Sequence, residues 1–254
     1  MNDVAMESER REGLVVDSVS VQYGKIPAVI NVSLTVGPGE IVILVGPNSA
    51  GKSSLLQALA TRARFVKVTG SVFVNGQKID GMATSRRWRT GLRLVPQGRQ
   101  IFPSLDVEEN LRVVADNLDI PWGEAIESAR SFFPQIFLKR VGTPAGNLSG
   151  GEQQMLALAR VLIGKPRVLL LDEPGLGLAR VIIHELARVI QDLRRQNLVI
   201  LLTDQGVEAW AKIMNRAYVI IRGEMIGTAP DRNAAETLLG IKGWNDGKGI
   251  QEVG

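Results

Sequence analysis

The residues best suited to chemistry in this 254-residue chain lie at positions 46–53, where glycines, a lysine and a serine follow the spacing G-x-x-x-x-G-K-S. An apolar run precedes them and a helix-like segment, SSLLQALATRAR, follows, a context that argues against a chance match. Glycines at this spacing let successive backbone N–H groups and the next helix N-terminus face one anion. We therefore expect a phosphate-binding loop, with Lys52 on the β- and γ-phosphates and Ser53 on Mg²⁺. The residues expected to bind nucleotide here are Gly46, Pro47, Asn48, Ser49, Ala50, Gly51, Lys52, Ser53 and Ser54.

Two other segments carry polar residues where packing alone explains them poorly. In LSGGEQQ at 148–154, Ser149 can cap the following helix and the glycine pair exposes its first N–H groups, so a second helix end is offered to an anion. Asp172 and Glu173 end an apolar run that predicts a strand buried on both faces. Uncompensated charge at the edge of a core is costly, which favours a functional role for this carboxylate pair. Gln97 follows another buried strand, where its amide can point at a ligand.

The elements around these residues predict an α/β fold. Alternating and continuous apolar runs predict strands at 13–23, 29–36, 41–45, 70–76, 92–96, 167–172, 198–203, 216–222 and 224–228. Helical patterns are expected at 51–62, 106–111, 121–133, 155–164 and 181–195. The stretch 106–140 predicts a mostly helical lobe inserted between strands, and the polar first residues predict a mobile arm.

Composition limits the possible classes of protein. The chain has no cysteine, which excludes disulfides and zinc–thiolate sites. Its longest apolar runs have strand length, far below the roughly 20 residues of a membrane helix, so we do not expect it to span a bilayer. The formal net charge of +4 raises the question of nucleic acid or anionic lipid. The basic clusters at 62–67 and 86–89 lie in no nucleic-acid module, and solvated faces are the favoured interpretation.

With the phosphate loop, LSGGEQQ and VLLLDEP in this order, the chain resembles the nucleotide-binding subunits of ATP-binding cassette (ABC) transporters, from about residue 13 to 239. The resemblance implies a RecA-like nucleotide-binding domain over 13–240 with an antiparallel β subdomain and an α-helical subdomain at about 98–150. Residues 1–12 and 241–254 are expected to be a flexible arm and tail.

The resemblance also implies roles for single residues. Tyr23 looks like the aromatic residue that stacks on adenine, Asp172 like the carboxylate that orients Mg²⁺, and Glu173 like the base that polarises the attacking water. Gln97 looks like the residue that senses Mg²⁺ and the γ-phosphate. Gln205 aligns with the position that is usually a histidine in this family and is called the switch residue, where the side chain can donate a hydrogen bond to a γ-phosphate oxygen. The expected catalytic residues are thus Glu173, Gln205, Gln97 and Lys52. The expected metal site consists of Ser53, Gln97 and Asp172. The ATP site of a facing subunit would be closed by Ser149, Gly150, Gly151 and Glu152.

A finer resemblance is carried by VPQGRQIFP at 95–103, VEENL at 107–111 and DEPGLGLA at 172–179. These segments are similar to the ATPases of branched-chain amino acid importers and their urea and short-amide relatives, and to the shorter, second ATPase of such systems. The chain departs from the common pattern at Ser49, where many members have glycine, and at Gly175 and Arg180, where serine and proline are expected. Gln97 replaces a glutamate expected in this branch.

The implied function is ATP hydrolysis that powers solute import, with ATP and Mg²⁺ as cofactors. The implied partners are a second ABC ATPase, identical or different, transmembrane permease subunits and, indirectly, an extracytoplasmic solute-binding protein; no nucleic acid is expected. The implied location is the cytoplasmic face of the membrane. The alternative is a non-transport ABC ATPase that acts as a regulatory or nucleic-acid-associated module, while a kinase or GTPase is disfavoured by LSGGEQQ. Because an uncharged switch residue does not titrate, we expect no step in the pH dependence of turnover near neutrality from Gln205. His184, the only histidine, is expected to be a surface or interface residue and not a catalyst.

Overall fold

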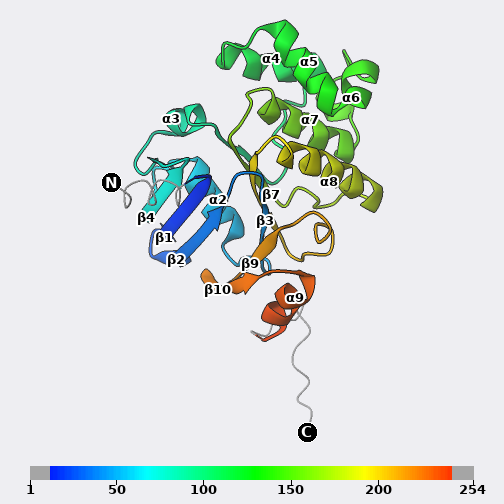
Figure 1. Cartoon of the computed structure of the whole chain (residues 1–254). Helices are drawn as coiled ribbons and strands as arrows, with labels where there is room; N and C mark the ends of the chain where they lie inside the picture. The colour runs from blue at the N-terminus through cyan, green and yellow to red at the C-terminus, as the bar shows by residue number, and fades with distance from the viewer. Residues whose placement is uncertain (1–11, 242–254) are drawn as a thin grey trace, which may run out of the picture.

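The computed structural model describes residues 12–241, which form two sheets and a set of surrounding helices (Figure 1). The strands are β1 (Leu14–Tyr23), β2 (Ile26–Val36), β3 (Ile41–Val45), β4 (Val66–Val74), β5 (Gln77–Lys78), β6 (Leu92–Val95), β7 (Val168–Asp172), β8 (Val199–Asp204), β9 (Arg216–Ile221) and β10 (Glu224–Ala229). The helices are α2 (Lys52–Ala60), α3 (Thr84–Arg89), α4 (Val107–Asn117), α5 (Trp122–Phe132), α6 (Pro134–Lys139), α7 (Gly150–Leu162), α8 (Arg180–Arg194) and α9 (Arg232–Ile241), with a 3-10 turn at Ala145–Asn147.

The larger sheet positions the chemistry. Its order is β10-β9-β3-β8-β7-β6, and every neighbouring pair is parallel except β9 with β10. All residues of β3 and β7 are buried, as expected for strands covered on both faces. Parallel strands end at the same edge, so the segments that follow β3, β6, β7 and β8 emerge side by side. This edge is where open α/β sheets bind ligands.

The smaller sheet is antiparallel, in the order β2-β1-β4-β5, and packs on one face of the larger one. The side chains of β3 point alternately to the two faces of the larger sheet. Val42 and Leu44 join the cluster with β1, β2 and α2, whereas Ile41, Ile43 and Val45 join the cluster with the helices on the other face. The α/β fold class predicted from the sequence is therefore confirmed.

The helices α4, α5 and α6 form a lobe at the top of Figure 1, with α7 beneath them. Helix α4 begins with a capping box, in which Asp106 accepts from the backbone N–H of Glu109 and Glu109 reaches back to that of Asp106, both at 2.8 Å. The buried Asn110 fixes the preceding loop through bonds to the N–H and the carbonyl of Phe102 at 2.9 Å each. The expected N-capped helix at 106 is confirmed.

The expectation that the basic cluster 86–89 is a solvated face is wrong for Arg87, which lies in α3, a helix that the sequence pattern did not predict. The Arg87 guanidinium is buried and donates to the carbonyls of Ala58 at 2.5 Å and Leu59 at 2.7 Å. These carbonyls end α2 and lack intrahelical partners. Arg87 therefore closes the C-terminus of the helix that starts at the phosphate loop.

Three further short or terminal elements, β5, α6 and α9, were not expected. The arm expected at 1–12 and the tail expected at 241–254 lie outside the described residues, except that Glu12 is described and Ile241 is the last residue of α9 instead of the first of the tail. Within residues 12–241, no helix has the length and apolar character needed to cross a membrane.

Candidate active site

The loop between β3 and α2 curls tightly because two of its glycines have no room for a side chain. A Cβ on Gly46 would lie 2.1 Å from the carbonyl oxygen of Ile220, and one on Gly51 would lie 2.3 Å from that of Ala28. Lys52, 4% exposed, donates to the carbonyls of Gly46 at 2.8 Å and Pro47 at 3.0 Å. The Lys52 side chain therefore folds back over the phosphate loop, where its ammonium group can contact bound phosphates.

A cavity of about 350 Å³ opens over this loop. It brings together one residue of β2, the phosphate loop with the start of α2, and the segments that follow β6 and β7, namely Ala28, Asn48, Ser49, Ala50, Gly51, Lys52, Ser53, Ser54, Gln97 and Glu173. Seven of the nine phosphate-loop residues expected to bind nucleotide therefore line one cavity, whereas Gly46 and Pro47 do not.

Ser49 lies in the left-handed region, with φ of 62°. The sequence expectation was that serine would be strained here if the backbone required positive φ, and the structure meets that condition. The conformation costs a residue with a Cβ about 1 kcal/mol, and glycine adopts it freely.

Ser49→Gly is therefore expected to raise the free energy of unfolding by about 0.5 kcal/mol, after the greater freedom of glycine in the unfolded chain is deducted. Ser54→Gly is the matched control, because Ser54 lies within α2, where glycine lowers stability by a similar amount. Thermal unfolding of both variants checks the signs, and a loss of stability in Ser49→Gly would contradict the strain.

Asp172 is held by two hydroxyl groups. Its Oδ1 accepts from Ser53 at 3.0 Å and from Thr203 at 2.8 Å, and the Thr203 oxygen in turn accepts from the backbone N–H of Glu173 at 3.0 Å. Thr203, fully buried, was not singled out from the sequence. The only signal was a hydroxyl residue directly after the apolar residues 199–202 of β8, two positions before Gln205. Thr203 therefore holds the carboxylate of Asp172 and the backbone of Glu173.

Glu173 lines the cavity and faces two other functional side chains. Its Oε1 is 3.1 Å from Lys52 Nζ, and its Oε2 is 3.5 Å from Gln97 Nε2. Its backbone is left-handed, with φ of 45°, an uncommon conformation that turns the chain directly after β7. Non-glycine residues in such conformations cluster at functional sites.

Oxygen ligands for Mg²⁺ are present at this site. The Ser53 hydroxyl and the Asp172 carboxylate converge at 3.0 Å, beside the lysine that faces the phosphate loop. Mg²⁺ prefers oxygen ligands and in nucleotide sites takes one or two from the protein, with phosphates and water completing the set. The donor set fits this cation.

The expected switch residue Gln205 follows β8 but is not among the lining residues of the cavity. Its backbone N–H donates to the Asp204 carboxylate at 2.6 Å. Burial raises the pKa of Asp204, as does the nearby Glu173, against hydrogen bonds from Trp210 and the backbone that lower it. The switch position is thus anchored by a carboxyl group whose charge is disfavoured.

The remaining expected site residues lie away from the cavity. Tyr23 ends β1, is 39% exposed and is not a lining residue. Ser149 caps α7 in a capping box with Glu152, whose pKa is lowered, against the effect of burial, by bonds from Ser149 and Arg140. None of Ser149, Gly150, Gly151 and Glu152 lines the phosphate-loop cavity. His184 is exposed on α8, as expected.

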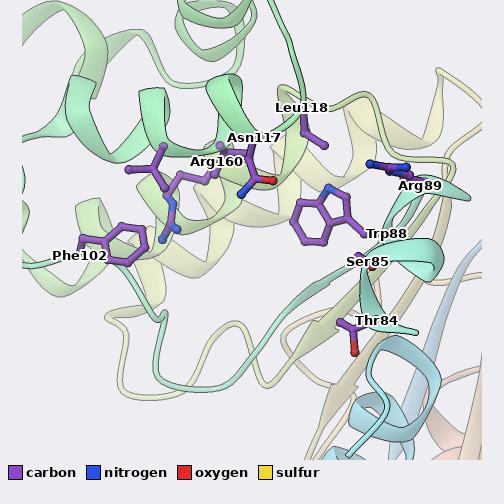
Figure 2. Close-up of a pocket in the computed structure, with 10 residues that line it drawn as sticks. Thr84, Ser85, Trp88, Arg89, Phe102, Asn117, Leu118 and Arg160 are labelled. Atoms are coloured by element: carbon purple, nitrogen blue, oxygen red, sulfur yellow. The ribbon is translucent and has the colours of Figure 1, made fainter. Parts of the chain in front are cut away.

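A second, larger cavity of about 560 Å³ lies between α3 and the helical lobe. Figure 2 shows Trp88 and Arg89 on one side of it, and Phe102 with Arg160 on the other. The Arg160 guanidinium stacks over the Phe102 ring at 4.7 Å and donates to the carbonyl of Gln100 at 2.8 Å. This groove joins apolar walls to two cationic side chains, and the loop that begins at Gln97 contributes Phe102 to its lining.

The family model for the ABC transporter matches residues 29–175, and the chain belongs to this family of ATP-hydrolysing subunits. The resemblance inferred from the phosphate loop, LSGGEQQ and VLLLDEP is confirmed.

The chain is 40% identical over 215 residues to the high-affinity branched-chain amino acid transport ATP-binding protein BraG of Pseudomonas aeruginosa, covering 83% of this chain and 89% of that protein. It is 36% identical to the probable branched-chain amino acid transport ATP-binding protein LivF of Archaeoglobus fulgidus (82% and 88%). It is 31% identical to the lipopolysaccharide export system ATP-binding protein LptB of Escherichia coli K12 (84% and 88%). The finer resemblance to the branched-chain branch is therefore confirmed. The fold matches the ADP conformation of MJ1267, an ATP-binding cassette of an ABC transporter, with a TM-score of 0.77, 21% identity and coverage of 89% and 94%.

Proposed function

We propose that this chain is the ATP-hydrolysing subunit of an importer of branched-chain amino acids or related small hydrophobic or amide solutes. The observation that carries the proposal is the convergence of Lys52, Asp172 and Glu173 at one sheet edge, in a chain 40% identical to a branched-chain amino acid transport subunit. The proposed nucleotide-binding domain comprises 13–240, with the helical subdomain at about 98–150.

In the proposed reaction, Lys52 leaves the Glu173 carboxylate for the β- and γ-phosphates of ATP. Glu173 is then free to accept the proton of the attacking water, while Gln97 orients that water or the γ-phosphate. Ser53 and Asp172 would hold Mg²⁺, which supplies charge neutralisation at the phosphates. Gln205 would donate its amide hydrogen bond to a γ-phosphate oxygen, and Tyr23 would stack on adenine.

In the proposed site, residues 149–152 act on the nucleotide of another chain, because the capped N-terminus of α7 lies outside the phosphate-loop cavity of its own chain. We propose that two ATPase subunits face each other head to tail. Each ATP then lies between the phosphate loop of one subunit and residues 149–152 of the other. Both helix N-termini attract the γ-phosphate, so hydrolysis removes the group that holds the subunits together.

The groove of Figure 2 is the proposed contact with the permease at the cytoplasmic face of the membrane. Its apolar walls and the cations Arg89 and Arg160 fit a short segment with an apolar face and an acidic or carbonyl group. Because the groove shares the loop that begins at Gln97 with the ATP site, a shift of Gln97 can be transmitted to the permease.

Copurification tests this function. A tagged chain, extracted from membranes in detergent, is expected to retain a multi-spanning permease and an ABC ATPase partner. Val113→Glu, which places a charge on the groove wall, is expected to reduce permease recovery at least tenfold. Leu138→Glu is the matched control, because Leu138 is an exposed apolar residue of α6 that does not line the groove. Equal recovery in both variants would place the permease contact elsewhere.

The similarity to lipopolysaccharide export ATP-binding proteins favours a second candidate, export by the same ATPase chemistry. Uptake of radiolabelled leucine by cells that carry or lack the chain distinguishes the two directions. Recovery of a stable soluble complex without a permease would instead support the non-transport alternative.

A further inference from the structure

Trp210 is the largest fully buried side chain among the described residues, and it lies in the loop that follows the switch position. Its backbone N–H donates to Val207 at 3.0 Å, and its carbonyl accepts from Ile213 at 2.9 Å and Met214 at 3.0 Å. These bonds fix the backbone on both sides of the indole. The ring therefore has a defined position in the molecule.

The nitrogen edge of the indole contacts Asp204, the residue directly before Gln205. Trp210 Nε1 donates to Asp204 Oδ2 at 2.6 Å, while Asp204 Oδ1 accepts from the backbone N–H of Gln205 at 2.6 Å. The backbone carbonyl of Asp204 also accepts from the N–H of Gly46, the first residue of the phosphate loop, at 3.3 Å. One residue thus joins Trp210, Gln205 and the phosphate loop.

Another edge of the same ring contacts the loop after Glu173. A Cβ on Gly175 would lie 3.4 Å from Trp210 Cζ2, so the ring lies directly over this glycine. Gly175 belongs to a tight turn, in which the N–H of Leu176 donates to Glu173 and that of Leu178 donates to Gly175, both at 3.1 Å. The indole therefore spans from the turn that carries Glu173 to the carboxylate that anchors Gln205.

We propose that Trp210 is a positioning residue for ATP hydrolysis. It holds Asp204, and through Asp204 also Gln205, at a fixed position relative to the turn at 173–175. The inference rests on the proposed role of Gln205. A Cβ at Gly175, where serine is expected, would make only ordinary van der Waals contact with the ring, so the ring and the turn pack against each other at this point. Movement of either loop is then transmitted to the other through one rigid ring.

Burial of a tryptophan in a core is the competing explanation, and it predicts a different result. A residue that only packs affects the free energy of unfolding and leaves the turnover of the folded molecules unchanged. A positioning residue affects kcat with little change in KM, because it supports a contact formed with the γ-phosphate as the reaction proceeds.

The test is Trp210→Phe in the complete assembly with which the chain copurifies. Phenylalanine retains an aromatic ring in the core and removes the N–H donor. We expect kcat for ATP to fall about fivefold, the size of one lost hydrogen bond, with KM within about twofold. Trp122→Phe is the matched control: Trp122 packs beneath Arg112 in the helical lobe and is expected to leave kcat unchanged.

Gln205→Ala provides the second arm. If Trp210 acts through Gln205, Trp210→Phe lowers kcat no further in the Gln205→Ala background. The inference would be overturned if the losses of kcat in the two single variants added up in the double variant. It would also be overturned if Trp210→Phe had a normal kcat while Gln205→Ala had a reduced one. A normal kcat in Gln205→Ala alone would refute the proposed role of Gln205 and the inference with it. Asp204→Asn, which keeps one acceptor oxygen instead of two, replaces Trp210→Phe if that variant does not fold, with the same expected loss of kcat and the same dependence on Gln205.

Discussion

Glu173→Gln is expected to bind ATP with native affinity and to hydrolyse it at least about a hundredfold more slowly, the usual contribution of a general base. The change keeps the shape of the side chain and one of its two acceptor oxygens, so only one of the contacts to Lys52 and Gln97 is retained. It removes the charge that accepts the proton, 3.1 Å from Lys52. Because the γ-phosphate is then retained, the assembly is also expected to stay in its ATP-bound, closed form.

Measurement of phosphate release and of ATP affinity checks this prediction. Glu124→Gln is the control, because Glu124 pairs with Lys165 on the surface and the loss of an exposed ion pair has little effect. Near-native phosphate release by Glu173→Gln would show that another group is the base.

Lys52→Met is expected to weaken ATP binding by at least about tenfold, since hydrogen bonds from a cation to a phosphate contribute roughly 1.5–3 kcal/mol. It is also expected to destabilise the ATP-free protein by about 3 kcal/mol. The loss of Lys52 leaves the Glu173 carboxylate buried without its cation.

The double variant Lys52→Met with Glu173→Gln separates these two effects. It removes the unpaired charge, so the melting temperature is expected to recover while ATP affinity stays low. Calorimetric titration with ATP and thermal unfolding provide the two readouts. Native affinity in Lys52→Met, or no recovery of stability in the double variant, would contradict the pairing.

Local residue patterns were sufficient to predict the sheet edge and most of its chemistry. The glycine spacing at 46–53 and the carboxylates at the end of an apolar run predicted which residues lie together, because parallel strands bring their carboxyl ends to one edge. The capped helix starts at Asp106 and Ser149 were predictable because a capping box is encoded within four residues.

The features that the sequence did not predict depend on partners far apart in the chain. Arg87 belongs to a charged cluster, and only the fold shows that carbonyls 29 and 28 residues earlier accept its hydrogen bonds. Thr203 bonds Asp172, 31 residues away. The contact of Trp210 with Gly175 has no sequence signal, because it depends on how two loops pack at one sheet edge.

The central claim is that the phosphate loop is half of an ATP site and that Ser149 of a facing subunit helps to close it. Asp and Asn are both good N-caps, so Ser149→Asp and Ser149→Asn each preserve the start of α7, and only aspartate places a negative charge against the γ-phosphate of the other subunit. In the assembled ATPase, we expect Ser149→Asp to hydrolyse ATP at least tenfold more slowly than Ser149→Asn, while both isolated chains bind ATP like the native one. Equal hydrolysis by the two variants would show that the site is complete within one chain and would contradict the account.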